Sequence, residues 1–250
     1  MARFRYRCSN GRFPPLGSRE GTQRLRFVAR MCAGVVLLPL LLACDALAQT
    51  SGPLVVPRVG GPIQLDGLSD EPAWDTVEPW LPTQYEPDNG APPTERTEFL
   101  VAYDDDYLYF ALRGYDRDSM GIRANTFYRD RLSGGDHFEI LLDTFNDNET
   151  GVLFTTTPTG NRIDAAISND ASGGGITSGQ WINQDFNTYW DVRTVVNHEG
   201  WFAEMRVPFT SLRFQDDDGQ VVMGIILQRK VARKTERLVF PPVPSIANWA

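Results

Sequence analysis

The sequence predicts an all-β fold, and three features of the chain lead to that prediction. From about residue 54 onward, apolar and polar residues alternate with a period of two, as is typical of half-buried strands. Clusters of Gly, Pro, Asn and Asp separate the alternating runs and mark turns. No long amphipathic helix is recognisable in this part of the sequence. Short strands at regular spacing predict a β-sandwich or a β-barrel.

The expected strands follow one another along the chain. The clearest pair is a hairpin in which RTEFLVAY (96–103) and YLYFALRGY (107–115) flank the turn Asp104–Asp106. Aliphatic and aromatic side chains alternate in its second strand, so its two faces differ. Further strands are expected at DHFEILLD (136–143), GVLFTTT (151–157), NRIDAAI (161–167), WDVRTVV (190–196), GWFAEMRV (200–207), VVMGIILQRKV (221–231) and RLVF (237–240).

The stretch LDGLSDEPAWD, residues 65–75, opens the folded part of the chain. A first strand is expected to end at Leu65, and Asp66–Gly67 then turns the chain. Ser69 is suited to cap a short helical turn that contains Pro72. Trp74 falls on the inner side of that turn, so we expect it to close one end of the core.

An export signal is expected over residues 1–48. Eight arginines lead into the apolar run MCAGVVLLPLLLA (31–43), and Ala46-Leu47-Ala48 offers a cleavage site of small residues. A cut before Cys44, which would leave a cysteine for lipidation, is the second reading. A retained membrane anchor is the third, and the short run interrupted by Pro39 argues against it. The expected location is the periplasm, the outer membrane or the extracellular space.

The remainder is interpreted as a linker at 49–58 and one domain at 59–250. The whole chain has a formal net charge of −8, and residues 1–48 contribute +6 from eight Arg, one Glu and one Asp, so the remainder carries −14. This acidity argues against nucleic acid and anionic lipid as partners and is compatible with neutral ligands or divalent cations. All three cysteines precede residue 49, which excludes disulfides and thiolate sites from the domain.

Five ordered motifs resemble those of family 9-type carbohydrate-binding modules, in the form found at the N-terminus of exported bacterial proteins. They cover about residues 59–240 and are DGLSDEPAW (66–74), TEFLVAYDDDYLYFALRGYD (97–116), GGDHFEILLDTFNDNE (134–149), FTTTPTG (154–160) and GWFAEMRVPFTSLRF (200–214). The resemblance implies an immunoglobulin-like or jelly-roll β-sandwich with a short N-terminal helical turn. It implies binding of oligo- or polysaccharide, including plant-type fragments, in polysaccharide breakdown or uptake. It also implies that a longer parent protein continues into an outer-membrane β-barrel, whose start the last residues would form.

Aromatic and amide side chains gather at two places that suit a sugar ligand. A sugar site needs flat rings for the apolar face of a pyranose and polar groups for its hydroxyls. One group lies in and beside the Gly/Ser-rich stretch 170–180, and the other lies by the Pro-rich stretch 85–95. The candidate ligand-binding residues are Trp181, Trp190, Tyr189, Gln180, Asn183, Trp80 and Tyr85.

A calcium site is the second expectation for the domain. The run DTFNDNE (143–149) concentrates oxygen ligands, which hard cations prefer, in one turn between strands. A turn rich in Asp and Asn is also a common structure without a metal, so both readings stay open. The candidate ligands are Asp143, Asn146, Asp147 and Glu149.

We expect no catalysis from this chain alone. The sequence lacks the G-x-S-x-G, P-loop and H-E-x-x-H motifs, and no spacing singles out a pair of carboxylates for glycoside hydrolysis. One alternative is an accessory domain of a glycoside hydrolase, which hydrolyses O-glycosyl bonds. Another is a haem-binding electron-transfer sandwich that uses one Met and one His, for which the candidates are Met205, Met223, His137 and His198.

Overall fold

The expected hairpin is present as β4 (Thr97–Tyr103) and β5 (Tyr107–Tyr115) in a computed structural model, which describes residues 1–7, 53–132, 134–168 and 182–244. The remaining strands of the described residues are β1 (Ala2–Arg7), β2 (Leu54–Val55), β3 (Thr83–Glu86), β6 (His137–Asp143), β7 (Gly151–Thr156), β8 (Arg162–Ile167), β9 (Ile182–Asn183), β10 (Asp191–Asn197), β11 (Gly200–Pro208), β12 (Gln220–Val231) and β13 (Glu236–Phe240). Single turns of 3-10 helix are η1 (Pro72–Trp74), η2 (Ser119–Gly121), η4 (Phe209–Ser211) and η5 (Ala232–Lys234).

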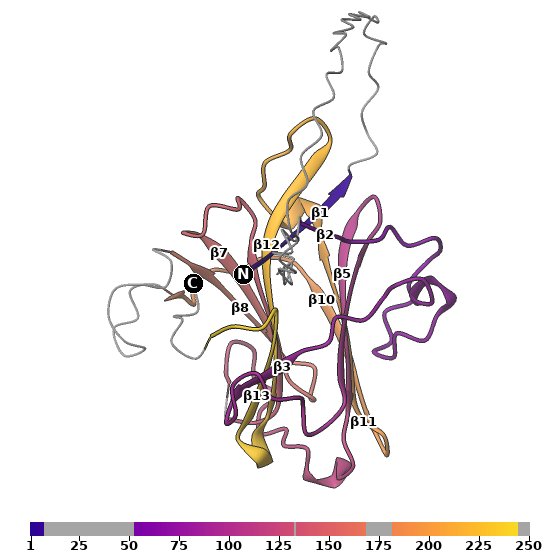
Figure 1. The fold of residues 1–250 in the computed structure, drawn as a ribbon, viewed down its shortest axis with the longest axis vertical. Coiled ribbons are helices and arrows are strands. Elements are labelled where there is room, and N and C mark those ends of the chain that lie inside the picture. Colours follow the sequence, from indigo (N-terminus) through magenta and orange to yellow (C-terminus); the bar gives the residue numbers. More distant parts are fainter. Residues whose placement is uncertain (8–52, 133, 169–181, 245–250) are drawn as a thin grey trace, which may run out of the picture.

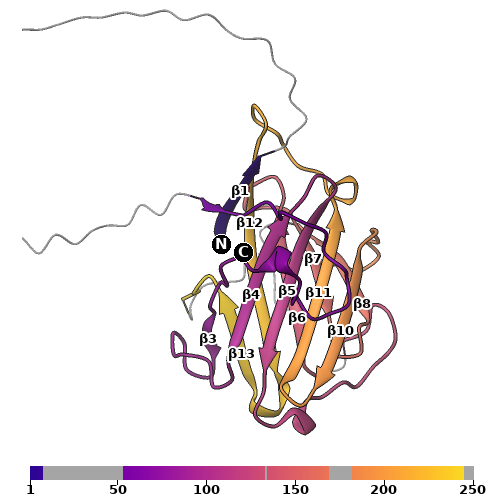
Figure 2. The same cartoon turned by 90° about the vertical axis from the view of Figure 1, so that its right-hand side faces the viewer.

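These strands form two sheets that pack face to face. Within the described residues, a nine-stranded sheet runs β2-β1-β12-β6-β7-β8-β9, with β13 pairing both β12 and β3, and a four-stranded sheet runs β10-β11-β5-β4. In Figure 1 the strands β7, β8, β3 and β13 lie to the left and β5 and β11 to the right. Figure 2 shows the four-stranded sheet from its outer side. The expected all-β sandwich is therefore confirmed.

The core lies between the two sheets because each strand alternates. On β6, Phe138, Ile140 and Leu142 are buried in this core, whereas His137 and Glu139 have the opposite parity and face outward. Burying each large apolar side chain contributes about 1.5–3 kcal/mol to folding, so such rows supply the main driving force in a chain whose described part has no cysteine.

The stretch that opens the domain packs on the outer side of the four-stranded sheet, which corrects the expectation that Trp74 closes the core. Trp74 is 2% exposed and packs with Leu100 and Ala111 in a second apolar cluster. Its indole Nε1 donates to Glu204 Oε1 at 3.0 Å, and the backbone nitrogens of Asp66 and Gly67 donate to Glu204 Oε2 at 3.0 and 2.9 Å. A single buried carboxylate thus fixes the whole stretch to β11.

The helical turn is present as η1, but its cap differs from the expected one. Its N-cap position is Glu71, and no side chain caps it. Ser69 instead accepts a hydrogen bond from Arg113 Nε at 2.9 Å, and its backbone carbonyl accepts another from Arg113 Nη2 at 2.6 Å. Ser69 therefore anchors the stretch to β5 rather than capping η1.

Residues on both sides of the interval 8–52 belong to the nine-stranded sheet. β1 pairs antiparallel with β12 over Ala2–Arg7, and β2, which falls in the stretch interpreted as a linker, pairs parallel with β1. The sheet in this structure therefore begins before residue 59, whereas the export signal over residues 1–48 stays a prediction. No helix in the described ranges has both the length and the apolar character needed to cross a membrane.

Candidate functional site

The outer face of the nine-stranded sheet carries a row of polar side chains, two of which are almost fully buried. Strand pairing places Thr155 on β7 opposite Glu139 on β6, and Glu139 opposite Gln228 on β12. Thr155 is 2% exposed and Gln228 is 6% exposed, whereas Glu139 keeps part of its side chain exposed. Since buried polar groups cost free energy unless they are paired, this row requires an explanation.

Gln228 is held in place by a neutral histidine. The Nε2 group of Gln228 lies 3.4 Å from Nε2 of His137, and Nδ1 of His137 lies 3.3 Å from the carbonyl oxygen of Gly135. Burial lowers the pKa of His137 to about 4, so the imidazole is neutral at pH 7. We assign its proton to Nδ1, which then donates to Gly135 while Nε2 accepts from the Gln228 amide. This pairing leaves Oε1 of Gln228 as an acceptor for another donor.

Glu139 is the acidic centre of the row. Within the described residues its carboxylate accepts one hydrogen bond, from the Thr155 hydroxyl at 3.3 Å. Burial raises the pKa of Glu139, although the Thr155 hydrogen bond and the charge of Arg237 oppose that rise. A carboxylate with so few donors around it has spare capacity to accept hydrogen bonds from a ligand.

Tyr85 lies on this face, at a β-bulge of β3. Thr83 pairs with Val239, which belongs to the apolar cluster of the outer face, and Tyr85 has the same parity as Thr83. The register shifts between Arg237 and Leu238, which pair with Glu86 and Gln84, so Tyr85 is the extra residue of β3. The Arg237 guanidinium lies 5.7 Å from the centre of the Tyr85 ring, and its Nε lies 3.7 Å from the Glu86 carboxylate. The pairing of β3 with β13 therefore places a ring and a cation beside the polar row.

An apolar patch completes this surface. Leu141, Ile226 and Val239 form a buried cluster, and Tyr85 packs against it. The surface thus combines an aromatic ring, an apolar floor, a carboxylate, an amide and a guanidinium. We name the following set the outer-face site: Tyr85, His137, Glu139, Thr155, Gln228 and Arg237.

The described residues that were expected from the sequence to bind a ligand do not lie together. Trp190 is 0% exposed, stacks edge-on against Phe154 at 5.4 Å and donates from Nε1 to Asp164 at 3.2 Å, so its ring offers no face to a ligand here. Trp80 stacks on Phe240 at 5.0 Å at the margin of the core. Asn183 is exposed on β9. Gln180 and Trp181 lie outside the described residues.

Tyr189 lies on the outer side of the other sheet. It is 59% exposed, and its hydroxyl donates to Asp191 at 3.1 Å. Asp191 also accepts from Arg206 Nη2 at 2.8 Å, and the Arg206 guanidinium lies 5.1 Å from the Tyr107 ring. In this group each polar side chain already has a partner. Of the aromatic candidates that the structure describes, only Tyr85 therefore belongs to the outer-face site.

The turn expected to bind calcium is closed by its own hydrogen bonds. Asp143 accepts from the backbone nitrogens of Asp147 and Asn148 at 3.1 and 2.9 Å, and Asp147 accepts from those of Glu149 and Thr150, both at 2.8 Å. Across the described ranges, no three His, Cys, Asp or Glu side chains lie close enough together to hold a metal ion. Of the candidates Asp143, Asn146, Asp147 and Glu149, the side chains of Asp143 and Asp147 therefore hold the turn, whereas Oδ1 of Asn146 is buried without a hydrogen-bond partner among the described residues.

Among the four candidates, no Met and His lie on the same side of a sheet, as a shared haem would require. Met205 and Met223 are 0% exposed in the core between the sheets. His137 faces outward from β6, and His198 is exposed in the turn between β10 and β11. The sulfur atoms and the imidazoles therefore point to different sides of the sheets.

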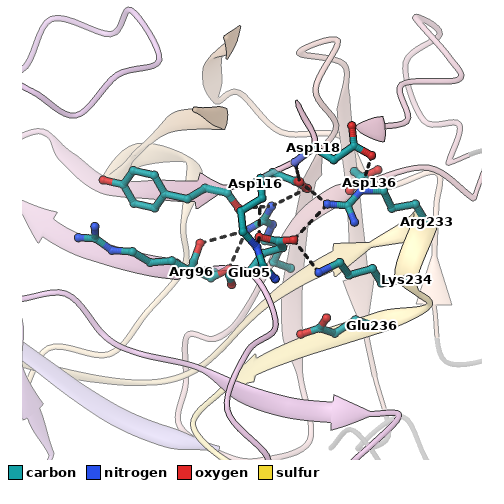
Figure 3. Close-up of polar contacts among 12 residues, drawn as sticks. Glu95, Arg96, Asp116, Asp118, Asp136, Arg233, Lys234 and Glu236 are labelled. Carbon is teal, nitrogen blue, oxygen red and sulfur yellow. Dashed lines mark hydrogen bonds and ion pairs between the residues drawn. The ribbon is translucent and has the colours of Figure 1, made fainter. Parts of the chain in front are cut away.

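A second concentration of charge is an ion-pair cluster at the end of the sandwich where η2 and η5 lie, and Figure 3 shows its members. Glu95 accepts hydrogen bonds from Lys234 Nζ at 2.6 Å and Arg233 Nη2 at 3.2 Å, and Asp116 binds Arg233. Arg229 is 0% exposed and donates to Thr97 Oγ1 at 2.7 Å. These contacts tie the β12–β13 connection to β4 and β5, so the cluster has a structural role.

The members of the outer-face site other than Tyr85 were not expected from the sequence. A signal was present, because Glu139 interrupts an apolar strand at a position that shares the parity of Leu141. Gln228 likewise follows the apolar run Gly224–Leu227 on β12. Polar residues at such central positions of strands are better guides to a site than aromatic residues in loops.

Comparisons with known proteins support the fold. One similar solved structure is a family 9 carbohydrate-binding module from Caldicellulosiruptor kristjanssonii in complex with glucose, with a TM-score of 0.51 and 17% identity over 77% of this chain and 87% of that one. Another is a protein from Bacteroides uniformis proposed to bind carbohydrate, with a TM-score of 0.54 and 13% identity over 78% of this chain and 91% of that one. No family model and no curated protein matches the chain. The chain therefore has the β-sandwich fold seen in family 9 carbohydrate-binding modules.

Proposed function

We propose that this chain binds carbohydrate without catalysing a reaction, and that the ligand lies on the outer-face site. The observation that carries the proposal is Glu139, a partly exposed residue whose carboxylate accepts one hydrogen bond within the described residues and which lies in a row with Thr155 and Gln228. The likeness of the fold to a module in complex with glucose makes this class of ligand the first to test.

The chemistry of these side chains suits a neutral, hydroxylated ligand. Glu139 is an acceptor for sugar hydroxyls, the Gln228 amide offers an acceptor, and Arg237 is a donor. The Tyr85 ring and the apolar floor suit the C–H face of a pyranose. A neutral ligand also fits a protein whose residues after 48 carry a charge of −14, obtained as −8 minus +6.

Isothermal titration with glucose and with cello- and xylo-oligosaccharides tests the proposal. We expect Glu139→Gln and Gln228→Ala to weaken binding about 10- to 100-fold, because each removes a hydrogen-bonding group in a partly desolvated site. Tyr85→Ala is expected to weaken binding about 3- to 10-fold through loss of ring contact.

Tyr189→Ala is the matched control, since it removes an exposed tyrosine from the opposite sheet. It is expected to leave the affinity unchanged. Equal affinity in the wild type and in the Glu139, Gln228 and Tyr85 variants would remove the ligand from this face. Absence of heat with every saccharide would reject carbohydrate as the ligand class.

Trp181 and Gln180 remain proposed contributors to the same ligand, and the aromatic character of Trp181 is the reason. Trp181→Ala belongs in the same titration series. We expect a loss of affinity similar to that of Tyr85→Ala. An unchanged affinity would mean that Trp181 does not contact the ligand and that the outer-face site binds it without this residue.

We further propose that the protein is exported and acts in polysaccharide breakdown or uptake, in a parent protein that continues into an outer-membrane β-barrel. The Arg-rich and apolar order of residues 1–48 supports export. Fractionation of cells that express the gene from its own start, followed by N-terminal sequencing, tests this proposal. Recovery of the uncut chain in the cytoplasm would contradict it.

Calcium binding at the 143–149 turn stays a proposal as well, supported by the oxygen-rich composition of that turn. If calcium binds, the Tm rises with added calcium and falls on addition of EDTA. A Tm that is the same with calcium and with EDTA would show that the turn needs no metal.

A further inference from the structure

Along one of its edges, the strand β12 pairs with two shorter strands, β1 and β13. β6 pairs with one side of β12 over Gly224–Lys230, and β13 pairs with the other side over Leu227–Val231. The first half of that second side, from Gln220 to Ile225, is paired with β1. Without β1, the backbone donors and acceptors along this half of the β12 edge would be unpaired.

The side chains of β1 are part of the core. Phe4 is 0% exposed and Tyr6 is 3% exposed, and both belong to the main cluster between the sheets. The Tyr6 ring lies 5.1 Å from Tyr103, 5.0 Å from Phe209 and 6.3 Å from Phe214. A pocket of aromatic side chains thus receives the tyrosine of this strand.

The intervening residues of β1 are basic and face away from the core. Arg3 and Arg5 are exposed and alternate with Phe4 and Tyr6. The parallel strand β2 covers the outer edge of β1, and Val56 donates from its backbone nitrogen to the carbonyl oxygen of Arg5 at 3.2 Å. Figures 1 and 2 both show β1 beside β12.

From this placement we infer that the Gln220–Ile225 edge of β12, with the pocket of Tyr103, Phe209 and Phe214, is a strand-acceptor site whose occupant is Ala2–Arg7. The backbone of β12 supplies hydrogen bonds of the kind by which sheets add a strand, and the pocket selects an aromatic residue at every second position. A cut in the interval 8–52 therefore leaves either a bound N-terminal peptide or an acceptor site that is open to it.

The experiment uses the full chain with a recognition sequence for a site-specific protease inserted between residues 8 and 52. After folding and cleavage, gel filtration with mass spectrometry shows whether the N-terminal fragment stays with the rest. The Tm is measured before and after cleavage, and again with the synthetic peptide MARFRYR added. Two variants of the same chain are matched: Phe4→Ser/Tyr6→Ser removes the buried rings, and Arg3→Gln/Arg5→Gln changes only exposed side chains.

We expect the wild-type fragment to stay bound and the Phe4→Ser/Tyr6→Ser fragment to separate, with a Tm about 10 °C lower or more. The Arg3→Gln/Arg5→Gln fragment is expected to stay bound. Loss of the wild-type fragment with a lowered Tm that MARFRYR restores, but the Ser-substituted peptide does not, also supports the acceptor site. Loss of the wild-type fragment with an unchanged Tm, or with a Tm that MARFRYR does not restore, overturns the inference.

Discussion

Two carboxylates, Glu95 in the ion-pair cluster and Glu139 in the outer-face site, have opposite environments. Glu95 accepts hydrogen bonds from Lys234, Arg233 and Arg117, whereas Glu139 accepts one from Thr155. Burial alone would raise the pKa of Glu95, but its hydrogen bonds outweigh burial and lower it to about 2. Burial raises the pKa of Glu139, because one hydroxyl does not compensate.

The comparison separates charge that holds the fold from charge that is available to a ligand. The donors around Glu95 are Arg233 and Lys234 of η5, which Figure 3 shows beside it, and Arg117, which follows β5. Glu139, in contrast, accepts one hydrogen bond from the described part of the chain. Removing a saturated carboxylate should damage stability, and removing an unsaturated one should damage binding.

Arg229→Met tests the structural side of the comparison and has the largest expected effect. Arg229 is buried and donates to Thr97 Oγ1 and to the Tyr115 carbonyl, so its loss leaves those acceptors without this donor and removes one of the two arginines beside Asp116. We expect a loss of about 3–5 kcal/mol in the free energy of unfolding, measured in urea. Ligand affinity of the folded fraction should be unchanged. A loss below about 1 kcal/mol would contradict the structural role of the cluster.

The paired variants Glu95→Gln and Glu139→Gln test the comparison directly. We expect Glu95→Gln to lower the free energy of unfolding by about 1–3 kcal/mol, since it weakens several charge-assisted hydrogen bonds. Glu139→Gln should leave that free energy unchanged or raise it at pH 7, because it removes a charge that burial disfavours. Urea unfolding of both variants under one condition measures the difference. If Glu139→Gln destabilises the protein more than Glu95→Gln does, the structural role would belong to Glu139 and not to Glu95.

The pH dependence of the Tm should show two windows, which overlap between about pH 4 and 4.5. The pKa of His137 falls from 6.5 to about 4 on folding, so its contribution to stability is present above pH 6.5 and is lost as the pH falls toward 4. The pKa of Glu95 falls from 4.5 to about 2, so its contribution is present above pH 4.5 and is lost between 4.5 and 2. Thermal unfolding from pH 7 to 2.5 measures both.

His137→Gln should flatten the pH dependence of the Tm in the upper window alone, and Glu95→Gln in the lower window alone. Each variant is therefore the control for the other. Identical profiles for the wild type and His137→Gln would mean that the imidazole is protonated equally in the folded and unfolded states.

The smallest expected effect is that of Arg206→Gln on the opposite sheet. Arg206 pairs with Asp191 over the Tyr107 ring, and exposed pairs of this kind contribute little. We expect no change in saccharide affinity and a small decrease in the Tm, measured by scanning calorimetry. A loss of saccharide affinity in this variant would move the ligand to the four-stranded sheet.

The strands were predictable because alternation is a local property of the chain. The predicted strand at 136–143 corresponds to β6, and the predicted strand at 200–207 corresponds to β11. The burial of Trp190 was also within reach, since Trp190 shares its parity with Val192, which is 5% exposed in the core. Trp190 was predicted to bind a ligand because it is an aromatic residue next to a loop. The alternation in the following strand, β10, already predicted that its side chain faces the core.

Features that depend on long-range pairing could not be read from the sequence. Tyr85 lies at the outer-face site because β3 pairs with β13, a strand far along the chain, and that pairing has no local signature. Ser69 was expected to cap η1, but Arg113, distant in the sequence, takes its hydroxyl. The pairing of Glu139 with Gln228 joins residues about 90 positions apart and needs the sheet order.

The position of Gln228 and Arg229 as neighbours on β12 has a consequence for how this sequence tolerates change. One side chain faces outward and the other is sealed inside, because successive residues of a strand point to opposite faces. Inserting or deleting a single amino acid upstream in β12 would send the guanidinium to the surface and the amide into the interior. An insertion or deletion in this strand should therefore abolish both folding and ligand binding. A conservative substitution of Gln228 should affect binding alone, and one of Arg229 should affect folding alone.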